Sequence, residues 1–266
     1  PATSNGRDNG GRGVPVELIA ETSSNHGGDL SLAKEFIHAF AEAGADWIKF
    51  QTTRVKHLRP DDPQYEWFTK AELSDQAHVE LKAECERAGA KFLTTVYHAD
   101  EVPFLASLKL EAIKIGSGEA REGGLAQAVM DVGHAWPLVF VGLGLCANNP
   151  YESVFAREAW AGRVVFLGAV TRYPAPGGIA SQVLRGPVTW ATTGVWFRAS
   201  GWSDHAIGTD ECRSAIVNGA SVIEKHVCLP NQARPVRPWE ATVEQFKALR
   251  AFADEDPARF LGRWQH

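Results

Sequence analysis

The sequence predicts an α/β fold, the (β/α)8 barrel known as the TIM barrel. Short β-like runs and amphipathic helical patterns alternate eight times along the 266-residue chain, as in such barrels. No Gly-x-Gly-x-x-Gly motif follows the first predicted strand, which disfavours the alternative, an open doubly wound sheet. Polar residues gather where the predicted strands run into the following loops, the place where barrels carry their catalytic groups.

The predicted strands are runs rich in aliphatic, β-branched and aromatic residues. The predicted helices repeat apolar residues at steps of three and four. Over 29–44, Phe36, Ile37 and Phe40 belong to such a stripe, and Asp29 or Ser31 caps its start. The strands are expected at 16–22, 46–52, 91–96, 111–116, 136–142, 163–168, 194–200 and 220–226. The helices are expected at 29–44, 75–89, 99–108, 122–133, 150–160, 178–190, 207–218 and 242–254.

Length and composition favour one domain. Residues 1–14 are rich in glycine and polar residues, so we expect a disordered leader there and a single barrel domain over 15–266. The net charge of −5, from 27 basic and 32 acidic side chains, argues against a nucleic-acid partner.

We also expect a cytoplasmic protein without a membrane partner. No apolar run approaches the roughly 20 residues that span a bilayer, and no charged-then-apolar leader precedes the first strand. The four cysteines form no Cys-x-x-Cys pair, which is typical of packed free thiols in a reducing compartment.

Two lysines stand inside runs that otherwise read as buried strands. Because side chains alternate along a strand, Lys49 and Gln51 point to the face opposite Ile48 and Phe50. Lys114 takes the corresponding place in a later strand. A buried ammonium is costly unless an anion meets it, so the pair predicts a site for a phosphate or carboxylate ligand. The alternative is that each lysine extends its amine to solvent.

His205 and His226 follow neighbouring strands, the seventh and the eighth. Two imidazoles from adjacent strands can meet at one divalent cation, with water and substrate oxygens in the other positions. Mn2+, Mg2+ and Co2+ all suit such a site. The alternative is a hydrogen-bonded histidine pair without metal.

Three further charged residues have open roles at this stage. Glu21 and Glu119 are either buried partners of the lysines or acceptors for substrate hydroxyls. Arg172 is either a second anion contact or a residue of the rim.

Several motifs at the strand ends carry a family resemblance. They include Lys-Phe-Gln-Thr at 49–52, Lys-Ile-Gly-Ser-Gly-Glu at 114–119, Ser-Asp-His at 203–205 and Glu-Lys-His at 224–226. In these, and over roughly residues 15–254, the chain resembles the barrel domain of the N-acetylneuraminate (sialic acid) synthase family. A chance match of these motifs in this order is very improbable.

The resemblance implies a reaction and a site. Family members join phosphoenolpyruvate to the aldehyde of an open-chain amino sugar, release phosphate and form a 2-keto acid. By position, the resemblance implies that His205 and His226 bind Mn2+ or Mg2+. It implies that phosphoenolpyruvate is held by Lys49, Thr95, Lys114, Ser117 and Ser203, and that the sugar faces Glu21, Gln51, Glu119 and Tyr173. Glu119 is a candidate proton carrier.

The chain departs from the family pattern in three segments, the first of which removes a hydroxyl on the phosphate side. Val141–Gly144 replaces a serine-threonine-glycine motif, and Gly168–Arg172 replaces a histidine-cysteine-threonine motif. Ala233–Glu240 replaces a proline-glycine-proline-aspartate motif, with Glu240 as a candidate for the aspartate. The match does not include the antifreeze-like domain that lends an arginine to the partner's site in family dimers, and a homodimer remains open.

These departures predict a phosphoenolpyruvate-condensing synthase with an unusual acceptor aldehyde. Two alternatives remain open: a metal-dependent aldolase or lyase on the same barrel, and a non-catalytic protein that binds sugar phosphates.

Overall fold

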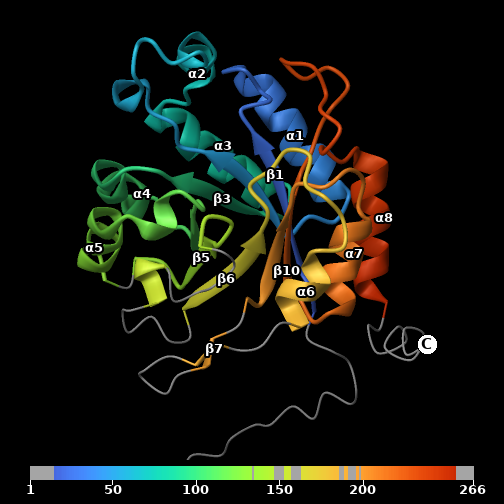
Figure 1. Cartoon of the computed structure of the whole chain (residues 1–266). Helices are drawn as coiled ribbons and strands as arrows, with labels where there is room; N and C mark the ends of the chain where they lie inside the picture. The colour runs from blue at the N-terminus through green and yellow to red at the C-terminus, as the bar shows by residue number, and fades with distance from the viewer. Residues whose placement is uncertain are drawn as a thin grey trace, which may run out of the picture.

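Eight parallel strands close into a barrel in the computed structural model (Figure 1), as the sequence predicts. The structure describes residues 15–133, 135–146, 153–156, 163–185, 189–190, 196–197 and 199–255. The expected disordered leader over 1–14 lies outside these residues. Around the barrel the order is β1 (Glu17–Ser23), β10 (Val222–His226), β9 (Gly201–Asp204), β6 (Val164–Ala169), β5 (Leu138–Gly142), β4 (Ala112–Ile115), β3 (Lys91–Val96) and β2 (Trp47–Gln51).

Helices surround the barrel (Figure 1) and bury their apolar stripes against it. Of the helix expected over 150–160, the structure describes only part, where the 3-10 turn η5 (Val154–Ala156) lies. No helix among the described residues combines the length and apolarity needed to cross a membrane. The helices are α1 (Leu30–Glu42), α2 (Tyr65–Ala71), α3 (Asp75–Arg87), α4 (Val102–Ser107), α5 (Gly123–Asp131), α6 (Ala180–Arg185), α7 (Asp210–Val217) and α8 (Val243–Asp254), with 3-10 turns η1 (Val55–His57), η2 (Ala99–Glu101) and η3 (Glu119–Arg121).

The seventh barrel strand differs from its prediction. The run expected at 194–200 contains β8 (Trp196–Phe197), which pairs antiparallel with β7 (Thr189–Trp190) outside the barrel. The barrel strand is β9, which begins at Gly201 and contains Ser203. A Cβ at Gly201 would lie 2.3 Å from Leu167 Cδ2, so glycine is required for the close approach of the strands. Its low strand propensity hid β9 in the sequence, whereas the aromatic run before it gave a stronger signal.

The barrel interior is layered. An apolar plug includes Ile19, Trp47 and Phe140, and the last two meet edge to face at 5.5 Å between ring centroids. Two residues further along their strands, the same inward positions carry Glu21 and Lys49. Strand alternation therefore places a charged layer directly on an apolar floor.

The four cysteines Cys85, Cys146, Cys212 and Cys228 are buried thiols that form no disulfide bond, as the sequence predicts.

Candidate active site

A cavity of about 240 Å³ opens above the charged layer, at the carboxyl ends of the strands. Every predicted site residue except Arg172 and the candidate Glu240 lines it. The lining residues are Glu21, Lys49, Gln51, Thr95, Tyr97, Lys114, Gly116, Ser117, Gly118, Glu119, Leu145, Thr171, Tyr173, Ser203, His205, Glu224 and His226.

Lys49 has a full set of partners inside the protein. Its Nζ lies 2.7 Å from Glu21 Oε2 and 3.7 Å from Glu224 Oε2, and donates to Thr95 Oγ1 at 3.1 Å. Burial acts to lower the pKa of Lys49, but the two carboxylates outweigh it and the pKa is raised. Glu21 is therefore a buried partner of Lys49, one of the two roles that its sequence position left open.

The buried charge of Lys114 has fewer partners inside the protein than that of Lys49. Its Nζ donates to the Ile115 carbonyl at 3.1 Å and lies 4.0 Å from Glu224 Oε2. Burial lowers the pKa of Lys114, and the nearby ammonium of Lys49 adds to this effect. An anion entering the cavity would relieve this cost directly.

The end of β5 packs closely on this ammonium. A Cβ at Gly142 would lie 2.8 Å from Ser117 Oγ and 3.1 Å from Lys114 Nζ. The backbone N–H of Gly144 donates to Ser117 Oγ at 3.0 Å. The absence of a side chain at position 142 therefore leaves room for Ser117 and Lys114.

Glu224 is a residue of the cavity that the sequence analysis did not single out for the site. It accepts a hydrogen bond from Ser203 Oγ at 2.8 Å. Burial opposes its charge, but Lys114 and Lys49 lower the pKa of Glu224 to about 2. Its place two residues before His226, on the same face of β10, was the signal that could have found it.

The two histidines lie together, with ring centroids 5.3 Å apart. His205 Nδ1 lies 2.6 Å from the Val170 carbonyl, which can only accept. The proton of His205 therefore sits on Nδ1, and Nε2 accepts from the Tyr173 hydroxyl at 3.1 Å. Burial lowers the pKa of His205, which keeps the ring neutral at neutral pH.

A serine fixes the tautomer of the second histidine. Ser23 Oγ donates to Glu21 Oε1 at 3.2 Å and so accepts from His226 Nδ1, 3.0 Å away. Burial, with the neighbouring imidazole of His205 and the ammonium of Lys49, holds the pKa of His226 well below its usual range. Ser23 adopts a φ of 53° at an irregularity in β1, a strained conformation of the kind found at functional sites.

Both imidazoles thus carry a lone pair on Nε2, as metal-ligating histidines do, and in this structure the lone pair of His205 accepts from the Tyr173 hydroxyl. Among the described residues, no group of three or more His, Cys, Asp and Glu side chains could hold a metal ion. The pair fits a cation that takes its other ligands from water and substrate.

A buried ion pair lies on the outer face of the same strands. Lys225 Nζ contacts Asp204 Oδ2 and the Ala206 carbonyl, each at 2.6 Å. Asp204 also accepts from Cys212 Sγ at 3.2 Å. Because Asp204 and Lys225 pair in register and precede His205 and His226 directly, the ion pair joins the two strands that carry the imidazoles.

Glu119 and Glu21 are two further carboxyl groups that line the cavity. Burial raises the pKa of both carboxyl groups. Glu21 Oε1 also accepts from Gln51 Nε2 at 3.1 Å. A carboxyl group with a raised pKa is suited to moving protons near neutral pH.

Two candidates lie away from this cavity. Arg172 is exposed and is not among the residues that line it. Glu240 is buried and holds the loop after β10: its oxygens accept from Asn25, from Gln232 and from the backbone N–H of Arg237. Glu240 therefore acts as a loop anchor, contrary to the expectation that it would grip the sugar.

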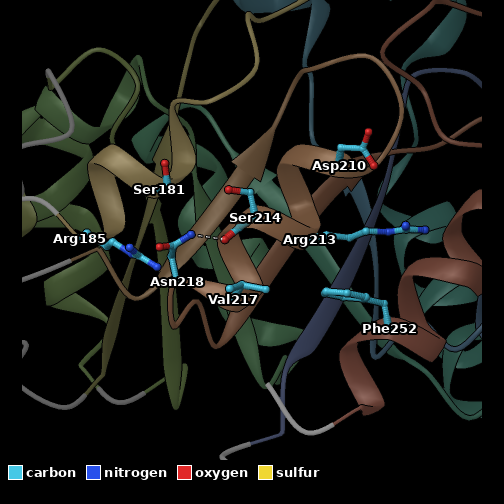
Figure 2. Close-up of a pocket in the computed structure, with 8 residues that line it drawn as sticks. All are labelled: Ser181, Arg185, Asp210, Arg213, Ser214, Val217, Asn218 and Phe252. Atoms are coloured by element: carbon cyan, nitrogen blue, oxygen red, sulfur yellow. Dashed lines mark hydrogen bonds between the residues drawn. The ribbon is translucent and has the colours of Figure 1, made fainter. Parts of the chain in front are cut away.

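A larger groove of about 710 Å³ lies outside the barrel, where α6, α7 and α8 meet (Figure 2). Its wall includes Arg213, whose guanidinium lies 5.5 Å from the ring centroid of Phe252 on α8. None of the described residues that line it is a predicted site residue. Its helical lining separates it from the strand ends, so the smaller charged cavity is the candidate site.

Known proteins are similar to this chain in sequence and in fold. Residues 36–250 match the model of the NeuB family. The chain is 28% identical to the N,N'-diacetyllegionaminic acid synthase of Campylobacter jejuni, over 87% of this chain and 73% of that protein. It is 28% identical to the pseudaminic acid synthase of Helicobacter pylori, over 91% and 77%.

Solved structures agree on the fold. The sialic acid synthetase of Leptospira borgpetersenii, crystallised with citrate, superposes with a TM-score of 0.80 at 24% identity, covering 94% of this chain and 86% of that one. A truncated 3-deoxy-D-arabino-heptulosonate 7-phosphate synthase of Thermotoga maritima gives a TM-score of 0.64 at 16% identity, covering 93% and 88%. With the family model matching most of the sequence, this chain belongs to the NeuB family.

Proposed function

We propose that this protein condenses phosphoenolpyruvate with an aldehyde, an amino sugar or a related compound, to give a 2-keto-3-deoxy acid and phosphate. The observation that carries the proposal is the presence, in one cavity, of an under-compensated ammonium and a pair of neutral imidazoles. Family membership and the synthase names of the relatives support it.

The anionic substrate would lie deep in the cavity, on the ammonium groups of Lys49 and Lys114. Phosphoenolpyruvate carries a phosphate and a carboxylate, and ammonium and hydroxyl donors form strong charge-assisted hydrogen bonds with both. Lys114 would gain an anion that it lacks inside the protein, whereas Lys49 would be shared between that anion and Glu21. The residues proposed to hold phosphoenolpyruvate are Lys49, Thr95, Lys114, Ser117 and Ser203.

The aldehyde would approach from the mouth of the cavity, where Gln51 and Glu119 follow the two lysines along the chain. C3 of phosphoenolpyruvate bonds to the aldehyde carbon, whose oxygen becomes a hydroxyl. Water adds at C2, the bond from C2 to the phosphate oxygen breaks, and a ketone forms as phosphate leaves. Glu119, whose pKa is raised by burial, is proposed to carry a proton between these oxygens. Glu21, Gln51 and Tyr173 are proposed to face the acceptor.

His205 and His226 are proposed to hold Mn2+ or Mg2+, with Co2+ as a further alternative. A divalent cation at this place supplies Lewis-acid polarisation of the aldehyde oxygen. The role of the protein is to fix both rings through Val170 and Ser23, so that each has its lone pair on Nε2. At His205 the cation would replace the hydrogen bond from the Tyr173 hydroxyl.

Phosphate release tests this function. The protein is mixed with phosphoenolpyruvate, Mn2+ and a panel of aldose and N-acylamino aldose acceptors. We expect phosphate release that depends on the acceptor, on Mn2+ and on His205, with loss of metal stimulation in His205→Ala. Absence of phosphate with every acceptor, together with no binding of phosphoenolpyruvate, would rule the proposal out in favour of a non-catalytic role. Cleavage of 2-keto-3-deoxy acids without phosphate would favour the aldolase alternative.

A further inference from the structure

Tyr173 lies against the two imidazoles of the charged cavity, although 47% of its surface is exposed. Its ring centroid is 4.2 Å from that of His205 and 5.8 Å from that of His226. Its hydroxyl donates to His205 Nε2 at 3.1 Å, and so engages the lone pair that the proposed cation would use. Whatever holds this half-exposed ring in place therefore bears on the cation site.

A second aromatic side chain, Trp239, packs on Tyr173 from the loop after β10. The two rings meet in a T-shaped arrangement with centroids 5.4 Å apart, a favourable geometry for an aromatic pair. Trp239 is half-buried and is not among the described residues that line the charged cavity. Of the described rings that contact Tyr173, it is the one that does not belong to a proposed cation ligand.

A tight turn fixes Trp239 within its loop. The backbone N–H of Glu240 donates to the Arg237 carbonyl at 3.0 Å, which makes residues 237–240 a β-turn with Pro238 in the second position, where proline is favoured. The guanidinium of Arg237 lies 5.4 Å from the ring centroid of Trp239. The carboxylate of Glu240 ties the turn to Asn25 at 3.1 Å. The indole is therefore held by the turn itself, by a guanidinium and by the anchor of the loop.

Backbone hydrogen bonds tie both loops to the histidines. In the loop after β6, the N–H of Ala175 donates to the His205 carbonyl at 2.8 Å. In the loop after β10, the N–H of Ala241 donates to the His226 carbonyl at 2.8 Å. The contact between the two aromatic rings is thus built on the same backbone frame as the imidazole pair.

We propose that Trp239 is a positioning residue of the cation site: it holds the Tyr173 ring so that the hydroxyl stays on His205 Nε2 and competes there with a divalent cation. The inference rests on the proposed function and adds a control on cation affinity to it. Binding of a cation costs one hydrogen bond at His205. The ring contact with Trp239 keeps the released hydroxyl beside the imidazole pair, where it can donate to an oxygen of the substrate.

Mn2+ titration of the substrate-free protein, followed by electron paramagnetic resonance, tests the competition. Tyr173→Phe keeps the ring and removes the hydroxyl, so we expect Mn2+ to bind about two- to tenfold more tightly, the range of one neutral hydrogen bond. Trp239→Ala releases the Tyr173 ring and should also tighten Mn2+ binding, by no more than Tyr173→Phe does. Trp239→Phe retains an aromatic ring and should restore most of the wild-type affinity.

A double variant separates positioning from a general disturbance of the loop. If Trp239 acts through the Tyr173 hydroxyl, adding Trp239→Ala to Tyr173→Phe should leave the Mn2+ affinity of Tyr173→Phe unchanged. Trp67→Ala is the matched control and should bind Mn2+ like the wild type, because Trp67 is also half-buried and lies 5.6 Å from the guanidinium of Arg234 in the same loop. Unchanged or weaker Mn2+ binding in Tyr173→Phe would overturn the inference, as would an effect of Trp239→Ala that persists without the hydroxyl.

NMR of the metal-free protein labelled with 15N-histidine reads the hydrogen bond itself. The resonance of His205 Nε2, assigned with His205→Gln, responds directly to a hydrogen bond that this nitrogen accepts. Tyr173→Phe should move this resonance, Trp239→Ala should move it in the same direction, and Trp67→Ala should leave it in place. If Trp239→Ala fails to fold by circular dichroism, Trp239→Leu carries the test, because it keeps an apolar side chain without the ring. A resonance that stays in place in Tyr173→Phe would contradict the proposal.

The two measurements also separate this inference from the proposed function. Absence of Mn2+ binding in every variant, with the resonance moving as expected, would refute the cation of the proposed function and support the positioning of Tyr173 by Trp239. Equal Mn2+ affinity in the wild type and in Tyr173→Phe, with an unmoved resonance, would refute only the positioning role.

Discussion

Two buried lysines on the barrel strands show how differently the inner and outer faces of the sheet are built. Lys225, on the outer face of β10, has no exposed surface and lies 2.6 Å from Asp204. Lys114, on the inner face of β4, is 4% exposed, and its nearest described carboxylate, Glu224, lies 4.0 Å away. Burial alone thus does not mark a ligand site; the marker is a buried charge whose protein partner is too distant to neutralise it.

The comparison predicts the largest effect for Lys225→Met. This substitution leaves Asp204 as an uncompensated buried carboxylate, which typically costs about 3–5 kcal/mol of folding free energy. Urea denaturation followed by circular dichroism measures the loss. A loss below about 1 kcal/mol would mean that the pair contributes little to holding the strands together.

Lys114→Met should behave in the opposite way. It removes a charge that burial disfavours, so we expect the free energy of unfolding to change by less than about 1 kcal/mol, the scale of a typical neutral hydrogen bond. Binding of phosphoenolpyruvate should weaken by about 2 kcal/mol or more, roughly 30-fold, as for other truncated buried charge contacts. Calorimetric titration checks this. Unchanged affinity would contradict the assignment of Lys114 as the anion contact.

A smaller effect is expected when the hydrogen bond that orients His226, a proposed cation ligand, is removed. Ser23→Ala removes the hydroxyl that fixes Nδ1 of His226, and such outer-shell changes typically cost about 10- to 100-fold in metal affinity. Mn2+ titration followed by electron paramagnetic resonance measures this change. Ser31→Ala is the matched control, since Ser31 lies in α1 outside the charged cavity. Equal Mn2+ affinity in both variants would argue against His226 as a ligand.

The smallest effect is expected from a change of pH. The pKa of Lys114 is lowered in the native protein, so between that value and the ordinary lysine value the unfolded chain binds more protons than the native one. Stability from this group therefore rises with pH in that window. Affinity for phosphoenolpyruvate should fall in the same window with a slope of at most one proton, because the neutral amine no longer meets the anion. Lys114→Arg should move this fall beyond the accessible range.

Much of this architecture could be predicted from the sequence, because strand alternation and helix periodicity are local properties. Lys49 and Lys114 were placed on the inward face by counting residues along their strands. β9 was misplaced because Gly201, which the neighbouring strands require, weakens the pattern that reveals a strand. α2 was missed because its seven residues are too few for a clear period.

The partners within the cavity were harder to predict. The approach of Glu21 and Glu224 to Lys49 depends on how three strands are staggered around the barrel, which no single strand encodes. The role of Glu240 as a loop anchor likewise depends on Asn25, more than 200 positions earlier in the chain.

The apolar floor of the barrel has a kinetic consequence for the proposed reaction. Among the described residues, Trp47 and Phe140 close the lower end of the barrel, so the charged layer opens at the carboxyl ends of the strands. A small anion seated on Lys114 must enter before a longer aldehyde lies across the opening, and the long product must clear that opening before the next small anion can enter. Compulsory order of addition would thus follow from the shape of the barrel, without a moving lid.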